Sequence, residues 1–178
     1  MPFHVWLPAA HPVAPSPVSA LMSGVVIKMG IYGLLRLLSW LPNLPISCAI
    51  GLMIVSLLTG VMGILYALGQ HQIKRMLAYS SVENIGIIGL AISVALLGRS
   101  LQQPVLVVFG LGGALLHVLN HALFKGLLFL SAGAVLHDTG TGDMERLGGL
   151  AQSTPVNALA FLIGSVAICA LPPLNGFV

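Results

Sequence analysis

The feature that constrains this chain most is a succession of apolar segments, each close to the length of a membrane-spanning helix. A helix needs about 20 apolar residues to cross roughly 30 Å of hydrocarbon. A transmembrane barrel would instead show strands of about ten residues with alternating polarity, a pattern that this sequence lacks. The sequence predicts an all-α polytopic membrane protein of about five transmembrane helices, over residues 17–40, 46–68, 76–97, 105–136 and 156–178.

The composition excludes several other classes of protein. Hydrophobic residues make up 57% of the 178 residues and charged residues only 6%, against about 25% charged in a soluble domain. The net charge is +3, but several of the basic residues lie inside apolar segments, so no basic patch predicts nucleic-acid binding. Cys48 and Cys169 also lie in apolar runs and form no disulfide or metal-binding pattern.

Two segments outside the predicted helices differ in character. Residues 1–16 are rich in proline, and Phe3, His4 and Trp6 suit the headgroup level of a bilayer, so we predict an interfacial loop. Residues 137–154 carry both acidic and basic side chains and are predicted to face water. The start lacks the pattern of a signal peptide and the end is abrupt, so we expect residues 1–178 to be a partial transporter domain from a longer protein.

The predicted helix over residues 105–136 carries His117, His121 and Lys125 at intervals of four. It exceeds a simple span, so we expect it to be tilted, broken near residues 110–113 or extended beyond the membrane. At 3.6 residues per turn the three side chains form one row. A charge at bilayer depth costs at least ~2.5–3.5 kcal/mol, and ionisable groups there by default mark a pathway. The row therefore predicts proton transfer, since histidine titrates near neutral pH.

Two other interpretations of this row stay open. The three side chains could form a polar packing face that is hydrogen-bonded to neighbouring helices. Histidines four residues apart also match zinc spacing, but the helix lacks the Glu of H-E-x-x-H and no Cys or carboxylate nearby completes a site. We therefore expect no metal, and no cofactor or catalytic motif is found in the sequence.

Further ionisable side chains lie within or next to the predicted helices. Lys28 lies near the middle of its helix, too far from either end for a lysine to reach water comfortably. Glu83 is the carboxylate within the predicted spans, and its partner could be Lys28, His117 or Lys125. Lys74 is predicted to anchor a helix end at the interface, with a second possible role in admitting protons from the cytoplasmic side.

Two consecutive prolines, Pro172 and Pro173, interrupt the last apolar segment. Proline lacks a backbone donor and clashes with the preceding turn, so the helix is predicted to break there. A broken helix at membrane depth is tolerated only beside protein or a wet cavity.

Four motifs in order resemble the antiporter-like membrane subunits of respiratory complex I and membrane-bound hydrogenases. They are PFHVWLPAAHPVAPSPVSALMSGVVIKMGIYGLLR (2–36), IKRMLAYSSVENIG (73–86), HALFKGLLFLSAG (121–133) and ALPPLNGF (170–177). The ENIG stretch and GTGDMERLGGLA (140–151) are most similar to the hydrogenase-4 and formate hydrogenlyase type. Members of this family have about fourteen helices in two inverted repeats, each containing one broken helix.

The resemblance implies roles for several residues of this chain. Lys28 matches the lysine that connects two half-channels, and His117, His121 and Lys125 match polar groups of the eleventh helix. Pro172-Pro173 matches the break of the twelfth helix. The glutamate of the fifth helix, the lysine of the seventh and the charged residue of the twelfth fall outside this chain, and Gln72 replaces a common Asp.

The resemblance implies proton translocation within a redox-driven complex of the inner (plasma) membrane. Its expected partners are other membrane subunits, lipid and a peripheral hydrogenase or dehydrogenase arm, where the redox chemistry takes place. One alternative is a subunit of a multisubunit cation/proton antiporter without a redox partner. Another is a non-conducting scaffold or a gene remnant.

Overall fold

The computed structural model describes residues 4–41 and 44–177, and these residues form helices without a β-strand, which confirms the all-α prediction. The elements are α1 (Trp6–Val13), α2 (Ser16–Leu21), η1 (Met22–Val26), α3 (Ile27–Trp40), α4 (Ile46–Leu68), α5 (Ile73–Ser100), α6 (Pro104–Thr139), η2 (Met144–Arg146), α7 (Leu150–Ser153), α8 (Pro155–Ile168) and η3 (Asn175–Phe177). Within this part of the chain, four helices are long and apolar enough to span a membrane: Ser16–Trp40, Ile46–Leu68, Ile73–Ser100 and Pro104–Thr139.

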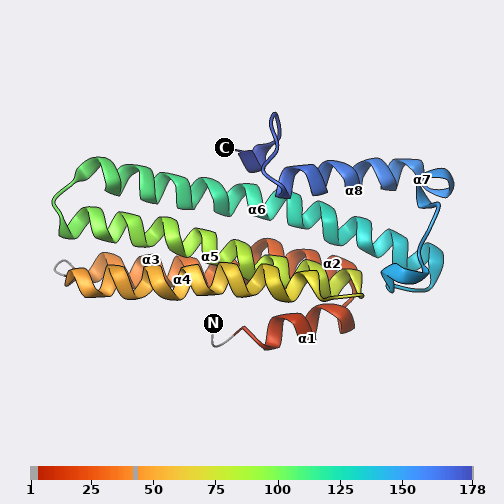
Figure 1. Ribbon diagram of the computed structural model, residues 1–178, viewed down its shortest axis with the longest axis horizontal. Helices are drawn as coiled ribbons and strands as arrows, with labels where there is room; N and C mark the ends of the chain where they lie inside the picture. Colours follow the sequence, from red (N-terminus) through yellow and green to blue (C-terminus); the bar gives the residue numbers. More distant parts are fainter. Residues whose placement is uncertain (1–3, 42–43, 178) are drawn as a thin grey trace.

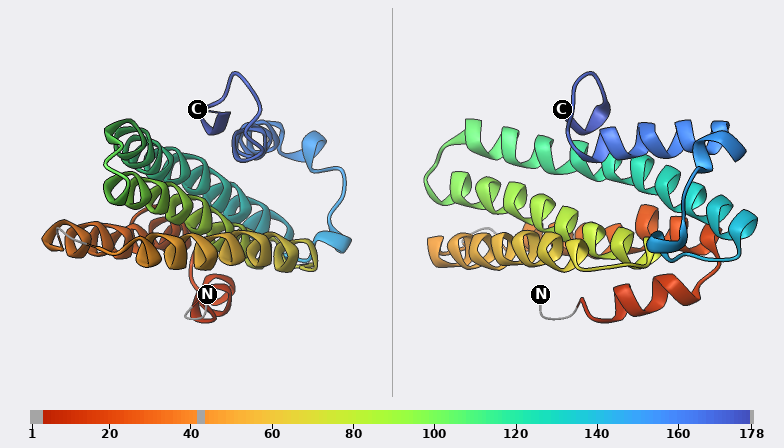
Figure 2. Two further views of the ribbon diagram at one scale, coloured as in Figure 1. Left: turned by 60° about the vertical axis from the view of Figure 1, so that its left-hand side comes forward. Right: turned by 45° about the vertical axis from the view of Figure 1, so that its right-hand side comes forward.

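The four spans lie side by side with α5 at the centre (Figure 1). Helix α5 packs between α4 and α6, and α8 lies along the second half of α6. Helix α2 contacts α6, and α1 lies on the outside of the bundle against α5 (Figure 2). Helix α6 is continuous over all 36 of its residues, without a break near residues 110–113.

Buried apolar side chains form two clusters around α5. One contains Ile73, Leu77, Leu128, Phe129 and Ala132, and the other Ile31, Ile88, Ile92 and Ala114. The outer faces of α3, α4 and α6 instead expose large hydrophobic side chains, as expected of surfaces that meet lipid or neighbouring helices.

Helices α4 and α5 approach each other closely at Gly63. A Cβ atom built at this position would lie 2.6 Å from the backbone nitrogen of Glu83 and 2.9 Å from its Cα atom. Small residues at such contacts let backbones pack without side chains between them. The close approach fixes the turn of α5 that carries Glu83 and Asn84.

The prediction that residues 1–16 form a loop was wrong for residues 6–13, which form α1. Pro8 lies in the first turn of α1, where its missing backbone donor would have no helical partner. Leu7 and His11 lie four residues apart and are both buried. Packing of this face against α5 therefore outweighs the poor helix propensity of prolines.

The last predicted helix, 156–178, is shorter in the structure. Helix α8 ends at Ile168, four residues before Pro172. A helix that continued through Pro172 would direct the proline ring at the carbonyl of Ile168 and leave that carbonyl without a donor. The first span also differs from a regular helix, because η1 is a π-helical turn between α2 and α3.

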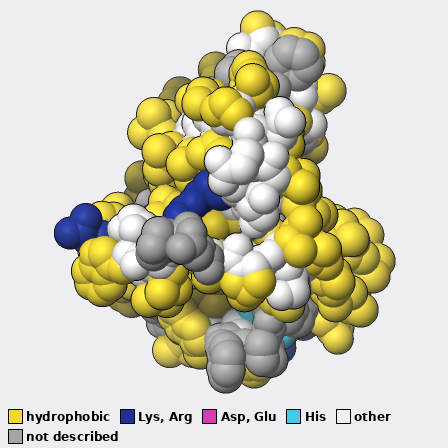
Figure 3. Space-filling view, turned by 90° about the vertical axis from the view of Figure 1, so that its left-hand side faces the viewer, with side chains coloured by type: hydrophobic (Ala, Val, Ile, Leu, Met, Phe, Trp, Pro, Cys, Tyr) yellow, Lys and Arg dark blue, Asp and Glu magenta, His cyan; other side chains and the backbone are white. Residues whose placement is uncertain are grey.

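The two ends of the bundle differ in charge. The end where α5 joins α6 is mostly hydrophobic, with isolated basic side chains (Figure 3). There Arg99 donates to the carbonyls of Leu38 and Leu41, at 3.1 and 3.0 Å. The opposite end, called the Lys74 end below, carries an exposed contact between Nδ1 of His71 and Oε1 of Glu145 at 2.7 Å.

Candidate functional site

Helix α6 brings His117, His121 and Lys125 into one row, as their spacing predicts. His121 and Lys125 are fully buried, and His117 is half-buried. Each step of four residues rises about 6 Å along the helix. The row thus runs along the inner face of α6 toward the Lys74 end, from a half-buried group to two that are closed off from solvent.

Lys28 meets this row from a separate helix. It is buried in the first turn of α3, immediately after the π-helical turn η1. Its Nζ atom lies 2.5 Å from Nδ1 of His121 and also donates to the carbonyl of Ser23, which belongs to η1. A wider helical turn of this kind frequently occurs at functional sites. Lys28 and His121 are therefore in direct contact, although 93 residues separate them in the chain.

Lys125 is held by α5. Its Nζ atom donates to the carbonyl of Leu77 at 2.9 Å and to the hydroxyl of Ser80. The Ser80 hydroxyl also lies 3.1 Å from the Leu77 carbonyl, to which it donates. The amine of Lys125 is therefore hydrogen-bonded within the protein, with no exposure to solvent.

Two buried serines connect the surroundings of the two lysines. The hydroxyls of Ser23 and Ser81 lie 2.8 Å apart, and Ser81 donates to the same Leu77 carbonyl that accepts from Lys125. Sequence analysis missed these serines. The hydroxyl groups of Ser23, Ser80 and Ser81 within apolar helices were the available signal, since a hydroxyl buried there requires a partner.

His117 is positioned by Asn84, which sequence analysis also did not select. Nε2 of His117 lies 2.9 Å from Oδ1 of Asn84, and the Asn84 amide donates to the backbone carbonyl of Ser80 at 2.7 Å. The rings of His117 and His121 have centroids 6.4 Å apart, too far for a nitrogen–nitrogen hydrogen bond. Proton transfer between these two imidazoles therefore requires an intermediate group or water.

Glu83 forms none of the salt bridges found among the described residues. Of the three partners left open above, the charge of Lys125 is the one that interacts with Glu83 electrostatically, while Lys28 contacts His121 and Ser23. Glu83 is half-buried on the side of α5 that faces α4.

Lys74 is buried, whereas the sequence predicts that it anchors a helix end at the membrane interface. Only 5% of its surface is exposed, and its Nζ atom donates to the carbonyl of Ala14 at 3.0 Å. Ala14 is the C-cap of α1, so Lys74 satisfies a carbonyl at the end of that helix. The neighbouring Arg75 is exposed and remains available as an anchor.

His11 on α1 is another buried group that sequence analysis missed, because residues 1–16 were predicted to lie at the headgroup level. Its ring is fully buried and stacks on Phe129 with centroids 4.4 Å apart and an interplanar angle of 12°. Neither ring nitrogen has a hydrogen-bond partner among the described residues. Burial, followed by the charges of Lys125 and Lys74, lowers the pKa of His11 to about 4.

The segment after α8 folds back onto α6 beside the row. The amide of Asn120 donates to the backbone carbonyl of Asn175 at 2.7 Å, and the Asn175 amide lies 3.3 Å from Oδ1 of Asn120. Asn120 directly precedes His121 in the chain. This pair of asparagines, called the amide clasp below, joins the segment around Pro172 and Pro173 to the helix that carries the row.

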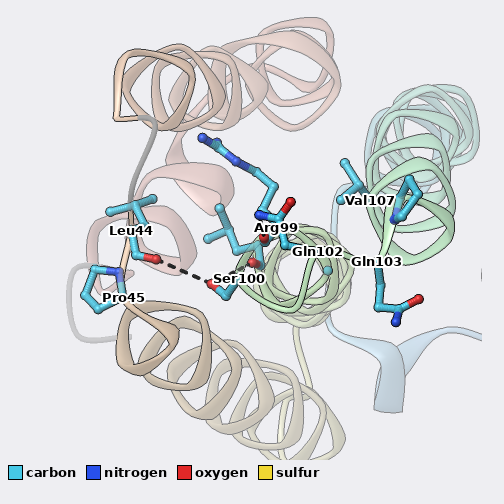
Figure 4. Close-up of a pocket in the computed structure, with 10 residues that line it drawn as sticks. Leu44, Pro45, Arg99, Ser100, Gln102, Gln103 and Val107 are labelled. Carbon is cyan, nitrogen blue, oxygen red and sulfur yellow. Dashed lines mark hydrogen bonds between the residues drawn. The ribbon is translucent and has the colours of Figure 1, made fainter.

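A cavity of about 760 Å³ lies away from these residues, at the end where α5 joins α6. Figure 4 shows its lining, which includes Arg99, Gln102, Gln103 and the hydrogen bond from Ser100 to the carbonyl of Leu44. None of the buried lysines or histidines lines it. Within residues 4–41 and 44–177, no cluster of three metal-ligating side chains occurs.

Comparison with known proteins identifies the family. A family model described as "NADH:quinone oxidoreductase/Mrp antiporter, TM" matches residues 1–178. The chain is 55% identical to hydrogenase-4 component B of Escherichia coli (strain K12) over 181 residues, covering 100% of this chain and 27% of that protein. It is 48% identical to formate hydrogenlyase subunit 3 of the same organism over 177 residues, covering 99% of this chain and 29% of that protein.

A solved structure has the same fold. A chain in the structure of the Mrp complex from Dietzia sp. DQ12-45-1b matches with a TM-score of 0.84 and 27% identity, covering 99% of this chain and 31% of that one. The present chain thus spans less than a third of the length of these proteins. It is a multi-pass protein of the inner membrane and belongs to the NADH:quinone oxidoreductase/Mrp antiporter transmembrane family.

Proposed function

We propose that this chain carries part of the proton path of a redox-driven membrane complex of the hydrogenase-4 or formate hydrogenlyase type. The observation that carries the proposal is the contact between Nζ of Lys28 and Nδ1 of His121, two buried titratable groups from different helices. A lysine and a histidine so placed can exchange a proton directly, because one nitrogen can hold the proton that the other releases.

Charge repulsion supplies the driving force within this path. Two ammonium groups in a low-dielectric interior destabilise each other, so protonation of Lys28 favours release of the proton from Lys125, and the reverse. The carboxylate of Glu83 opposes this release, since its charge stabilises the ammonium form of Lys125. A change in charge at either end of the row would therefore move a proton along it.

The redox chemistry belongs to partner subunits in this proposal. The expected partners are other membrane subunits and a peripheral hydrogenase or dehydrogenase arm, in keeping with the names of the two Escherichia coli relatives. The buried row contributes proton carriers and no redox centre. Lys28, His121, His117 and Lys125 are the carriers, and Lys74 lies where protons would enter or leave.

The experiment measures protons moved per electron by the native complex, purified through a tag on this chain and reconstituted into vesicles with a pH-sensitive dye. Lys125→Met is expected to lower the proton count, because it removes an acid–base group from its position on the path. Arg36→Met removes an exposed cation at the end of the first span and is the matched control. A normal proton count in Lys125→Met, with normal assembly, would refute the proposal.

A second candidate function is cation/proton antiport without electron transfer, which the structural similarity to the Mrp complex supports. The same vesicles distinguish it. A pH gradient that depends on sodium and forms without electron flow would assign antiport. If Lys28→Met and Lys125→Met both left coupling intact while deletion of the chain abolished assembly, the chain would be a scaffold.

A further inference from the structure

The end of the bundle where α5 joins α6 contains the cavity of about 760 Å³, which the proposed proton path does not use. Its polar lining consists of Arg99, Ser100, Gln102 and Gln103. Leu44 and Pro45, which precede α4, and Val107 of α6 form apolar walls beside these residues (Figure 4). A cavity that combines a few polar groups with apolar walls is the usual form of a ligand site.

A smaller cavity of about 110 Å³ adjoins the first and shares Leu96, Arg99 and Val107 with it. The rest of its lining is mostly apolar and comes from three helices: Leu35, Leu38, Ser39, Ile92, Ala95 and Leu111. Ile92 lies about 10 Å before Arg99 along α5, toward the middle of the bundle. The two cavities together therefore offer a polar region at the helix ends and an apolar region at greater depth.

The polar region lies at the level of the lipid headgroups. Trp40 ends α3 and is exposed, and the Arg36 guanidinium lies 5.6 Å from the centroid of its ring. Aromatic and basic side chains at helix ends mark the border between hydrocarbon and water. Arg99 donates to the carbonyls of Leu38 and Leu41 at the same end of α3, so its charge is held at this border.

This end of the chain carries cations but no carboxylates. Of the four acidic residues in the sequence, Asp138, Asp143 and Glu145 lie at the far end of α6 or beyond it, and Glu83 lies about 24 Å from Arg99 along α5. Figure 3 likewise shows no acidic side chain among the described residues of this face. A phosphate would meet the charge of Arg99, whereas the ammonium group of a zwitterionic lipid would find no anionic side chain. The charges therefore favour an anionic ligand.

We propose that the two cavities bind one anionic phospholipid, with its phosphate at Arg99 and an acyl chain in the apolar region. The amides of Gln102 and Gln103 can donate hydrogen bonds to oxygens of its headgroup. A free phosphate would occupy only the polar region, so the adjoining apolar cavity favours a lipid as the source of the phosphate. The bound lipid would join the ends of α3, α5 and α6. None of the four proton carriers named above lines either cavity, so this site is separate from the proton path.

The test places the native complex in phosphatidylcholine vesicles with a trace of phosphatidylglycerol that carries a photoreactive acyl chain. Mass spectrometry then measures the label on residues 92–111, and phosphatidylcholine with the same acyl chain gives the reference value. Phosphatidylglycerol is expected to label this segment about fivefold more, the ratio that corresponds to about 1 kcal/mol for one basic side chain at a membrane surface.

Arg99→Gln should remove this preference for phosphatidylglycerol. Arg36→Gln removes an exposed cation that lines neither cavity and should retain the preference. Equal labelling by the two lipids in the parent complex, or an unchanged preference in Arg99→Gln, would overturn the proposal.

A second pair of variants tests the apolar region and leaves Arg99 in place. Val107→Phe adds a ring at a position that lines both cavities, whereas Val108→Phe adds the same ring at a position that is 67% exposed. Val107→Phe should lower the label from phosphatidylglycerol to the phosphatidylcholine value, and Val108→Phe should leave it unchanged. Equal labelling of the two variants would overturn the proposal. Loss of the label from the parent complex on addition of inorganic phosphate would assign a site for free anions instead and overturn the lipid.

Discussion

The close approach of α4 and α5 gives a stability prediction that uses two glycines of one helix. Gly63→Ala places a methyl group 2.6 Å from the backbone nitrogen of Glu83, whereas Gly51→Ala meets no atom within 4 Å. Both substitutions raise helix propensity by a similar amount, about 0.5–1 kcal/mol. The difference between the two variants therefore isolates the overpacking cost, which is about 1–3 kcal/mol when backbone must shift.

The assay is the free energy of unfolding of the two variants in identical mixed micelles. Gly51→Ala is expected to equal or exceed the parent chain, and Gly63→Ala to lie about 1–3 kcal/mol below Gly51→Ala. Because Asn84 follows Glu83, Gly63→Ala should also disturb the hydrogen bond between Asn84 and His117 and weaken proton transport. Equal stability of the two variants would refute the argument that backbone contact limits this position.

Three further predictions concern the buried groups. Lys125→Met should change the free energy of unfolding by less than about 1.5 kcal/mol in micelles, because the Leu77 carbonyl and Ser80 hydroxyl remain bonded to each other. Since the pKa of His11 falls from 6.5 to about 4 on folding, the unfolded chain binds a proton there that the folded chain does not. Melting temperatures should therefore fall as pH drops through that interval, and His11→Phe should flatten the profile. Asn175→Ala removes the side-chain half of the amide clasp and should speed hydrogen exchange in residues 169–177.

The sequence predicts the parts of this fold that local patterns determine. Apolar length alone places the four long spans within a few residues of their observed ends, since backbone groups in a bilayer must be satisfied within each helix. The row of His117, His121 and Lys125 is equally local, because helical spacing fixes which side chains share a face. The positions of Pro172 and Pro173 likewise indicate that a helix ends near them.

Local patterns do not determine which side chains of different helices contact each other. The contact between Lys28 and His121 depends on how their two helices rotate against each other, and the sequence indicated only Glu83 as a possible partner of Lys28. The hydrogen bonds of Ser80 with Lys125 and of Asn84 with His117 depend on the central position of α5, which no local pattern determines. His11 was missed for a different reason, because burial against α5 makes a helix of a proline-rich segment that propensity assigns to a loop.

The most direct test of the account is a double-mutant cycle on proton transport by the native complex. If Lys28 and Lys125 act in series on one path, each single Met variant should lower the proton count per electron and the double variant should lose no more than the worse single. Electron transfer and assembly serve as internal controls. A normal proton count in either single variant, or losses that multiply in the double variant, would contradict a single path through the two lysines.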